Sequence, residues 1–325
     1  MLHETHLSGK TPLSTGRQVL VFLLIFFVAT MGQSLILLPA QLIAVFLDEA
    51  FQSAMSETAF GGLERIQATM EAMANALTNL PSWVMVVQLF STAVMIAVCL
   101  FYCVKMEKRS FVSLGFVKKG ALLEYLSGMG IGLVMFSASV LLCVVMRQGT
   151  FEFPLDVSRI PWGMIILYFM AFLVQGMSEE ILCRSYFMMS LSRGCKLWTC
   201  VLFNALMFAS LHIFNPGITP LALLNLTLFG IFASVYTLRR GSIWGISAIH
   251  SLWNFAQGNV FGVAVSGMGD NPTVFRLDTT QGSAWINGGS FGLEGGLAVT
   301  AVLLIGIVLV LLTKTKKSEL IDNVP

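Results

Sequence analysis

Eight apolar runs, each about as long as a bilayer is thick, constrain this chain more than any other feature. Mostly apolar runs of about eighteen residues or more predict membrane spans near 18–46, 83–104, 121–146, 160–178, 197–214, 219–238, 242–261 and 297–313. Hydrophobic residues make up 56% of the 325 residues and charged residues 11%, against roughly 25% charged in an ordinary soluble domain. The sequence therefore predicts an all-α fold, a polytopic transmembrane helix bundle with about eight spans.

The lysines and arginines are unevenly divided between the two sides that these spans define. Fourteen of the 19 fall on the side of the N-terminus, the even-numbered loops and the C-terminus. The opposite side has Arg65, Arg147, Arg159 and Arg276, and Arg184 falls within the helical run that continues the fourth span. The positive-inside rule then predicts that both termini lie in the cytoplasm.

The chain is predicted to form one integral membrane domain, 1–325, whose polar motifs fall within about 160–265. Two outer segments are long enough to have structure of their own. Segment 48–82 has acidic residues among Ala, Met and Leu at helical spacing, which predicts amphipathic helices, whereas segment 262–296 is rich in Gly, Ser and Asn, which predicts turns. A net charge of +2 without an arginine-rich patch argues against a nucleic-acid partner and leaves the lipid bilayer as the expected surroundings.

Polar residues inside the spans are the candidates for chemistry. A charged side chain within the bilayer costs about 2.5 to 3.5 kcal/mol on insertion scales, so each one needs a partner or a purpose. Three runs contribute such residues: the fourth runs directly into Glu179, Glu180 and Arg184, the fifth contains Phe208 and His212, and the seventh contains His250 and Asn254.

The spacing of these residues predicts how they meet. Glu180 and Arg184 are one helical turn apart and can form an ion pair, and His250 and Asn254 likewise share a face. Glu179 is rotated by about 100° from Glu180 and can point elsewhere. The ion pair has a structural interpretation that needs no catalysis, whereas Glu179 has no such local partner.

A hydrolytic site is the chemistry that fits these residues. A tight turn joins the fourth and fifth spans, so that Glu179 and His212 return to nearly the same depth, with His250 within about two turns of that level. A carboxylate beside a histidine in a desolvated pocket can take a proton from water. A second imidazole with an amide one turn away offers donors for the oxyanion of a tetrahedral intermediate.

In this order the motifs Glu-Glu-x-x-x-Arg, Phe-x-x-x-His and His-x-x-x-Asn resemble those of the CAAX protease and bacteriocin-processing enzyme family, also called the Abi family, of intramembrane proteases. The resemblance covers about a third of the chain. It implies that Glu179 activates the hydrolytic water with help from His212, and that His250 and Asn254 form the oxyanion site. It also implies that Glu180 helps to steady the helix and tunes the reactivity of Glu179.

By the same resemblance, Arg184 steadies the helix and Phe208 packs in support of the site. The implied function is an endopeptidase acting on membrane-associated peptides or proteins, either CAAX-type prenylated substrates or peptides such as bacteriocins in maturation. No cofactor is expected, and the implied location is a bacterial cytoplasmic membrane.

Three alternatives remain open at this stage. A zinc-dependent membrane peptidase would use Glu179, His212 and His250 as ligands, although no H-E-x-x-H motif is present. A proton-coupled transporter would use the same buried charges as a relay but would be expected to have inverted repeats. A non-catalytic immunity or partner protein would keep the motifs without the reaction.

Overall fold

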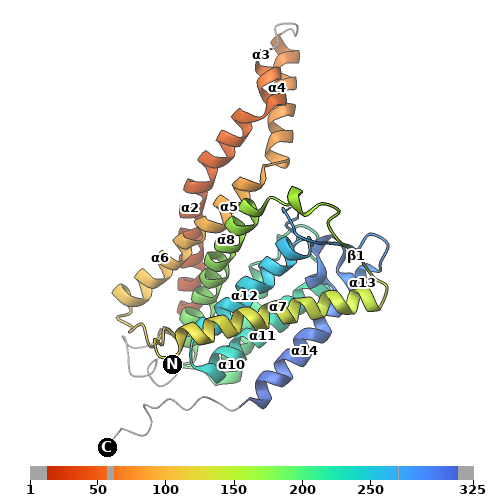
Figure 1. Ribbon diagram of the computed structural model, residues 1–325. Coiled ribbons are helices and arrows are strands. Elements are labelled where there is room, and N and C mark those ends of the chain that lie inside the picture. The colour runs from red at the N-terminus through yellow and green to blue at the C-terminus, as the bar shows by residue number, and fades with distance from the viewer. Residues whose placement is uncertain (1–12, 57–61, 270, 314–325) are drawn as a thin grey trace, which may run out of the picture.

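The computed structural model describes residues 13–56, 62–269 and 271–313, and helices make up nearly all of its secondary structure (Figure 1). The main helices are α2 (Thr15–Leu47), α5 (Ser82–Ser91), α6 (Ala93–Phe101), α7 (Ala121–Val145), α8 (Trp162–Glu180), α10 (Leu197–Ser210), α11 (Pro220–Arg240), α12 (Trp244–Phe255) and α14 (Leu297–Leu312). The predicted all-α class is confirmed.

Each predicted apolar run coincides with a helix, but the helices differ in length. Five helical stretches in the described ranges are long and apolar enough to cross a membrane: Thr15–Leu47, Ser82–Met106, Ala121–Val145, Trp162–Leu191 and Pro220–Arg240. Helices α10 and α14 are shorter, and α12 is extended only by the π-helical segment η4 (Ala256–Val260). The number of eight spans therefore stays a prediction.

The predicted run 197–214 is too long at its C-terminal end. Helix α10 ends at Ser210, and His212 lies in the turns that follow. The residues after Ser210 are still apolar, so hydropathy alone does not reveal the end of the helix. The break comes from Asn215-Pro216-Gly217, because proline disfavours a helical conformation in the preceding residue and Gly217 has a φ of +72°.

Helix α2 extends beyond the rest of the bundle and leads into a helical projection (Figure 1). The projection consists of α3 (Glu49–Ser56) and α4 (Gly62–Thr78). Ala76 of α4 packs with Val45 and Phe51 in a small separate core, while Leu63 and Met70 on α4 are exposed. The helices predicted for 48–82 are thus present, with an apolar packing side.

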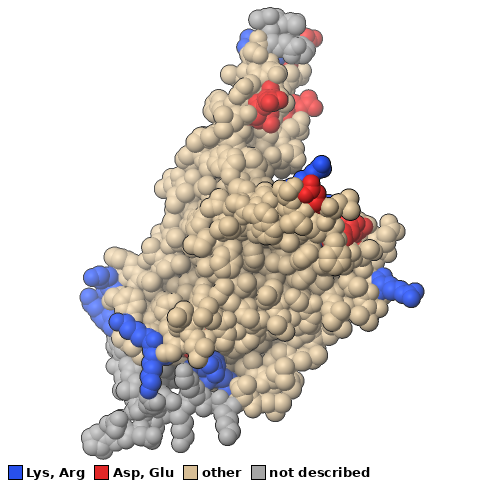
Figure 2. All heavy atoms as spheres, viewed as in Figure 1, with Lys and Arg blue, Asp and Glu red and all other residues tan. Residues whose placement is uncertain are grey.

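Lysine and arginine side chains gather at the end of the bundle away from this projection, and acidic side chains lie on the projection itself (Figure 2). The orientation expected from the sequence, with both termini in the cytoplasm, stays a prediction. Four of the basic residues counted there, Lys10, Lys314, Lys316 and Lys317, lie outside the described residues.

Helix α12 lies in the interior of the bundle between α7 and α8, and its residues from Gly245 to Asn254 are all buried. A Cβ added at Gly132 of α7 would lie 2.3 Å from the Ile249 carbonyl oxygen. One added at Gly176 of α8 would lie 2.4 Å from Ser251 Oγ. Since glycine lets helix backbones approach closely, these two positions allow α7 and α8 to pack directly on α12.

Turns and short elements make up segment 262–296, as expected. Strand β2 (Arg276–Asp278) pairs antiparallel with β1 (Thr150–Glu152), and α13 (Ala284–Asn287), η5 (Gly289–Phe291) and η6 (Leu293–Gly295) follow. Asn225 of α11 donates hydrogen bonds to the carbonyl oxygens of Glu294 and Gly296, at 2.7 and 2.9 Å. These bonds anchor the segment to the helices beneath it.

Candidate active site

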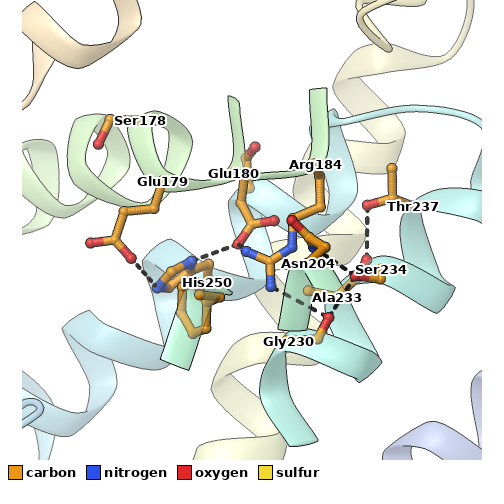
Figure 3. Close-up of polar contacts among 12 residues, drawn as sticks. Ser178, Glu179, Glu180, Arg184, Asn204, Gly230, Ala233, Ser234, Thr237 and His250 are labelled. Carbon is orange, nitrogen blue, oxygen red and sulfur yellow. Dashed lines mark hydrogen bonds and ion pairs between the residues drawn. The ribbon is translucent and has the colours of Figure 1, made fainter. Parts of the chain in front are cut away.

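Two adjacent carboxylates, Glu179 and Glu180, end the α-helical part of the long helix Trp162–Leu191. The helix continues as the π-helical segment η3 (Ile181–Met188). Short π-helical segments within α-helices are frequent at functional sites. The two carboxylates approach His250 from different sides (Figure 3), so that this histidine lies between them.

Glu180 and Arg184 form an ion pair in the interior of the protein. Arg184 Nη1 lies 2.9 Å from Glu180 Oε1, and both side chains are 0% exposed. The guanidinium also lies 4.6 Å from the ring centroid of Phe208, and its Nη2 donates to the Gly230 carbonyl oxygen at 3.5 Å (Figure 3). The pair expected from the four-residue spacing is therefore present, and the contacts of Arg184 are all internal.

His250 is held in one orientation by Glu180. Its Nδ1 lies 2.8 Å from Glu180 Oε1, and its Nε2 lies 3.7 Å from Glu179 Oε2 (Figure 3). The imidazole is 4.9 Å from the ring of Phe229 and 6.0 Å from that of Phe208, between centroids. When Nδ1 donates its hydrogen bond to Glu180, the other ring nitrogen, Nε2, is directed toward Glu179.

Glu179 is linked to α12 through a glutamine that the sequence analysis missed. Gln175 Nε2 donates to Glu179 Oε1 at 2.6 Å, and Asn254 Nδ2 donates to Gln175 Oε1 at 3.0 Å. Asn254 is thus connected to the carboxylate one helix away as well as sharing a face with His250. Gln175 lies four residues before Glu179, so the spacing rule that identified the ion pair could also have identified this residue.

His212 reaches the site from the turn after α10. Its Nδ1 lies 3.0 Å from the Phe208 carbonyl oxygen, and its ring is 5.0 Å from the ring of Phe208. The side chain is half-buried. Phe208 therefore contacts both His212, which lines the cavity, and Arg184, which is buried behind it.

A cavity of about 240 Å³ is lined by predicted residues from three helices, α8, α10 and α12, and from the turn after α10. Its lining includes Glu179, His212, His250 and Asn254, together with Phe208. Glu180 and Arg184 lie behind this lining. Several further polar side chains line the cavity and were not expected, namely Gln33, Gln88, Thr92, Gln175, Asn215, Ser266, Asn271 and Glu294.

The alternative zinc ligands share one cavity, and whether they hold a metal ion stays an open question for experiment. In the three described ranges, no group of three or more His, Cys, Asp or Glu side chains is arranged to hold a metal ion. Glu179, His212 and His250 share the cavity, but His212 Nδ1 contacts a backbone carbonyl and His250 Nδ1 contacts Glu180. In this structure both histidines therefore form hydrogen bonds within the protein.

Comparison with known proteins shows what this part of the chain is similar to. Residues 161–256 match the family model described as type II CAAX prenyl endopeptidase Rce1-like. The matched stretch contains every motif residue from Glu179 to Asn254. Comparison with curated proteins and with solved structures found no match. Together with five apolar helices of spanning length, the match indicates an integral membrane protein whose residues 161–256 are similar to the Rce1-like CAAX prenyl endopeptidase family, in agreement with the resemblance seen in its motifs.

Proposed function

We propose that this chain is an intramembrane endopeptidase that hydrolyses peptide bonds of membrane-associated peptides or proteins, using water activated by Glu179. The observation that carries the proposal is the division of the motif residues between two places. Glu179, His212, His250 and Asn254 line one cavity, whereas Glu180 and Arg184 form a buried ion pair behind it. The residues proposed to act on the substrate therefore line the cavity, while the ion pair that positions them is buried behind it.

Glu179 is suited to act as the general base. Its Oε1 accepts a hydrogen bond from Gln175, while its buried Oε2 accepts none within the described residues. The 3.7 Å from Oε2 to His250 Nε2 is too long for a hydrogen bond, so Oε2 keeps its capacity to accept one from water. Glu179 takes one proton of this water as its oxygen adds to the carbonyl carbon. His212 helps to orient the water.

The oxyanion formed by this addition needs donors, and His250 and Asn254 can supply them. Because His250 donates from Nδ1 to Glu180, its Nε2 also carries a proton only in the imidazolium form. Glu179 and Glu180 on its two sides stabilise that cation. Asn254 uses one N–H for Gln175 and has a second on the same nitrogen for the oxyanion. Glu179 then returns its proton to the amine nitrogen as the C–N bond breaks.

The proposed setting is a bacterial cytoplasmic membrane, crossed eight times, with both termini in the cytoplasm. The shorter helices α10, α12 and α14 would complete the bundle begun by the five long ones. Supporting this orientation, basic side chains gather at the end of the bundle away from α3 and α4 (Figure 2). Substrates would be membrane-tethered peptides, with or without a prenyl group.

The test is cleavage of a library of membrane-tethered and prenylated peptides by the detergent-purified protein. We expect wild-type protein to cleave, and Glu179→Gln and His212→Ala to lose activity, by about 10² to 10⁴-fold for the general base. Glu152→Gln, on exposed strand β1, is the matched control for a carboxylate outside the cavity and should cleave like wild type. Each protein is assayed with and without chelator.

The outcomes separate the alternatives. Activity that disappears with chelator and returns with Zn²⁺ would favour the zinc peptidase. Full activity in Glu179→Gln would refute the proposed base. No cleavage of any peptide by wild-type protein would favour a transporter or an immunity protein over an enzyme.

A further inference from the structure

A groove lined by α7, α11 and α14 lies apart from the catalytic cavity. Its volume is about 680 Å³, within the range of about 300 to 1,000 Å³ that is common for small-molecule sites, and no described residue lines both places. Helix α14 packs against α7 and against α11 (Figure 1). A Cβ added at Gly306 of α14 would lie 3.0 Å from Met135 Cε and 3.3 Å from Phe232 Cε2, so the three helices converge at the floor of the groove.

The inner part of this groove is apolar and open. Gly130 of α7 widens it, because a Cβ added at this position would meet nothing within 4 Å. Val134 of α7 and Leu309 of α14 also line the groove, and both side chains are exposed. Since α7 and α11 are among the helices of spanning length, these exposed apolar side chains are expected to face the hydrocarbon of a bilayer. The groove is therefore accessible to lipid chains.

The polar residues of the groove lie toward one end, namely Ser127, Tyr236, Arg240 and Thr313. Arg240 is the last residue of α11, and Thr313 directly follows α14. Along α11 the groove extends from Arg240 to Phe232, which is about 12 Å at about 1.5 Å rise per residue. One leaflet contributes about 15 Å to the hydrocarbon thickness of a bilayer. The groove thus has the length of the acyl region of one leaflet, with a polar end where a headgroup would lie.

Arg240 gives this end a positive charge. Its side chain is 39% exposed, and its Nε lies 3.9 Å from Glu124 Oε1, which is too long for a hydrogen bond. Neither of these two atoms has a hydrogen-bond partner within the described residues. Glu124 is buried and does not line the groove, so the guanidinium lies between it and the open end. A guanidinium presents N–H groups in a planar fork that matches the oxygens of a phosphate.

We propose that this groove binds one anionic phospholipid, with an acyl chain between α7, α11 and α14 and the phosphate at Arg240. The apolar length and the cationic end are complementary to an amphiphile whose headgroup has a net negative charge. Basic pockets between membrane helices recognise anionic headgroups in this way. The site shares no described residue with the catalytic cavity, so the inference does not depend on the proposed peptidase function.

The experiment is native mass spectrometry of the full-length protein in detergent, titrated with phosphatidylglycerol or with phosphatidylcholine that has the same acyl chains. We expect the first phosphatidylglycerol to bind about fivefold more tightly than phosphatidylcholine, because one cation near the membrane surface contributes about that factor. Equal affinities in the wild-type protein would overturn the proposal. Glycerol 3-phosphate at the same concentration should not displace the lipid. Displacement as effective as by free phosphatidylglycerol would indicate a site for phosphate alone and would also overturn it.

Two variants assign the binding to the groove. Arg240→Gln removes the cation and should lower the affinity for phosphatidylglycerol to about that for phosphatidylcholine. Gly130→Leu fills the apolar part, where the added side chain takes the space of the acyl chain, and should weaken the binding of both lipids by at least about fivefold. Phosphatidylglycerol binding that is unchanged in either variant would refute the proposed position of the lipid.

Each variant has a matched control outside the groove. Arg17→Gln makes the same change at an exposed arginine of α2, and Gly163→Leu places leucine at a glycine of α8 where an added Cβ also meets nothing within 4 Å. Both controls should bind the two lipids as the wild-type protein does. Equal losses in variants and controls would indicate lipid held without a specific site and would refute the proposal. Circular dichroism checks the helix content of every protein. If Gly130→Leu does not fold, Arg240→Gln, which changes a partly exposed side chain, still decides the question.

Discussion

Replacement of Arg184 by methionine tests whether the buried pair with Glu180 holds this part of the bundle together. Both partners are 0% exposed and 2.9 Å apart, so the change leaves a carboxylate in the interior with one fewer partner. Removing one member of a buried pair costs about 3 to 5 kcal/mol. His250 still contacts Glu180 at 2.8 Å, which places the expected loss near the lower limit, at about 3 kcal/mol.

The assay is reversible unfolding of the purified protein in mixed micelles, followed by circular dichroism. Arg159→Met is the matched control, because Arg159 forms an ion pair with Asp156 at 3.3 Å but its side chain is 87% exposed. Exposed pairs contribute about 0.2 to 1 kcal/mol. In the double variant Glu180→Gln/Arg184→Met, the loss should be smaller than the sum of the two single losses. If Arg184→Met lowers the free energy of unfolding no more than Arg159→Met does, the Glu180–Arg184 pair does not have the proposed structural role.

Three further predictions concern the cavity. Gly176→Ala should lower kcat/KM by at least about tenfold, because the new Cβ would meet Ser251 and shift α8 from α12; Gly163→Ala, where an added Cβ meets nothing within 4 Å, should not, and equal effects would count against the packing argument. Gln175→Ala should lower kcat by about tenfold with little change in KM, because Glu179 loses the donor that orients it; an unchanged kcat would show that this bond is dispensable. Finally, activity should survive dialysis against chelator, measured alongside the metal content of the protein, and loss of activity with the metal would contradict the glutamate mechanism.

The order and approximate extent of the helices could be predicted because bilayer thickness and apolar length are directly related. The ends of the helices were less predictable. The apolar run predicts a helix that includes His212 and continues to 214, yet α10 ends at Ser210 and the histidine lies in a turn. Hydropathy does not distinguish an apolar turn from an apolar helix, and here the turn follows from the Pro216 break.

Local spacing predicted the contacts that lie on one helix. Glu180 meets Arg184 because residues four apart on a helix are neighbours whatever surrounds them. Contacts between helices were not predictable in the same way. The bond from Asn254 to Gln175 depends on how closely α8 and α12 approach, which glycine at position 176 permits.

Glu294 marks the limit of the sequence argument. It lies 40 residues beyond the last motif residue, in a glycine-rich segment, and no periodicity connects it with Glu179. Only the path of segment 262–296 over the cavity brings the two carboxylates to one surface.

For this protein, sequence alone determined that the chain is a helix bundle for a membrane, which residues within it carry charge, and the family to which those residues point. These properties follow from transfer free energies and from helical repeat, which act locally. The tertiary structure alone decided which charges face the cavity and which are buried behind it. Those properties depend on the distances between helices and loops far apart in the chain, which are set by packing.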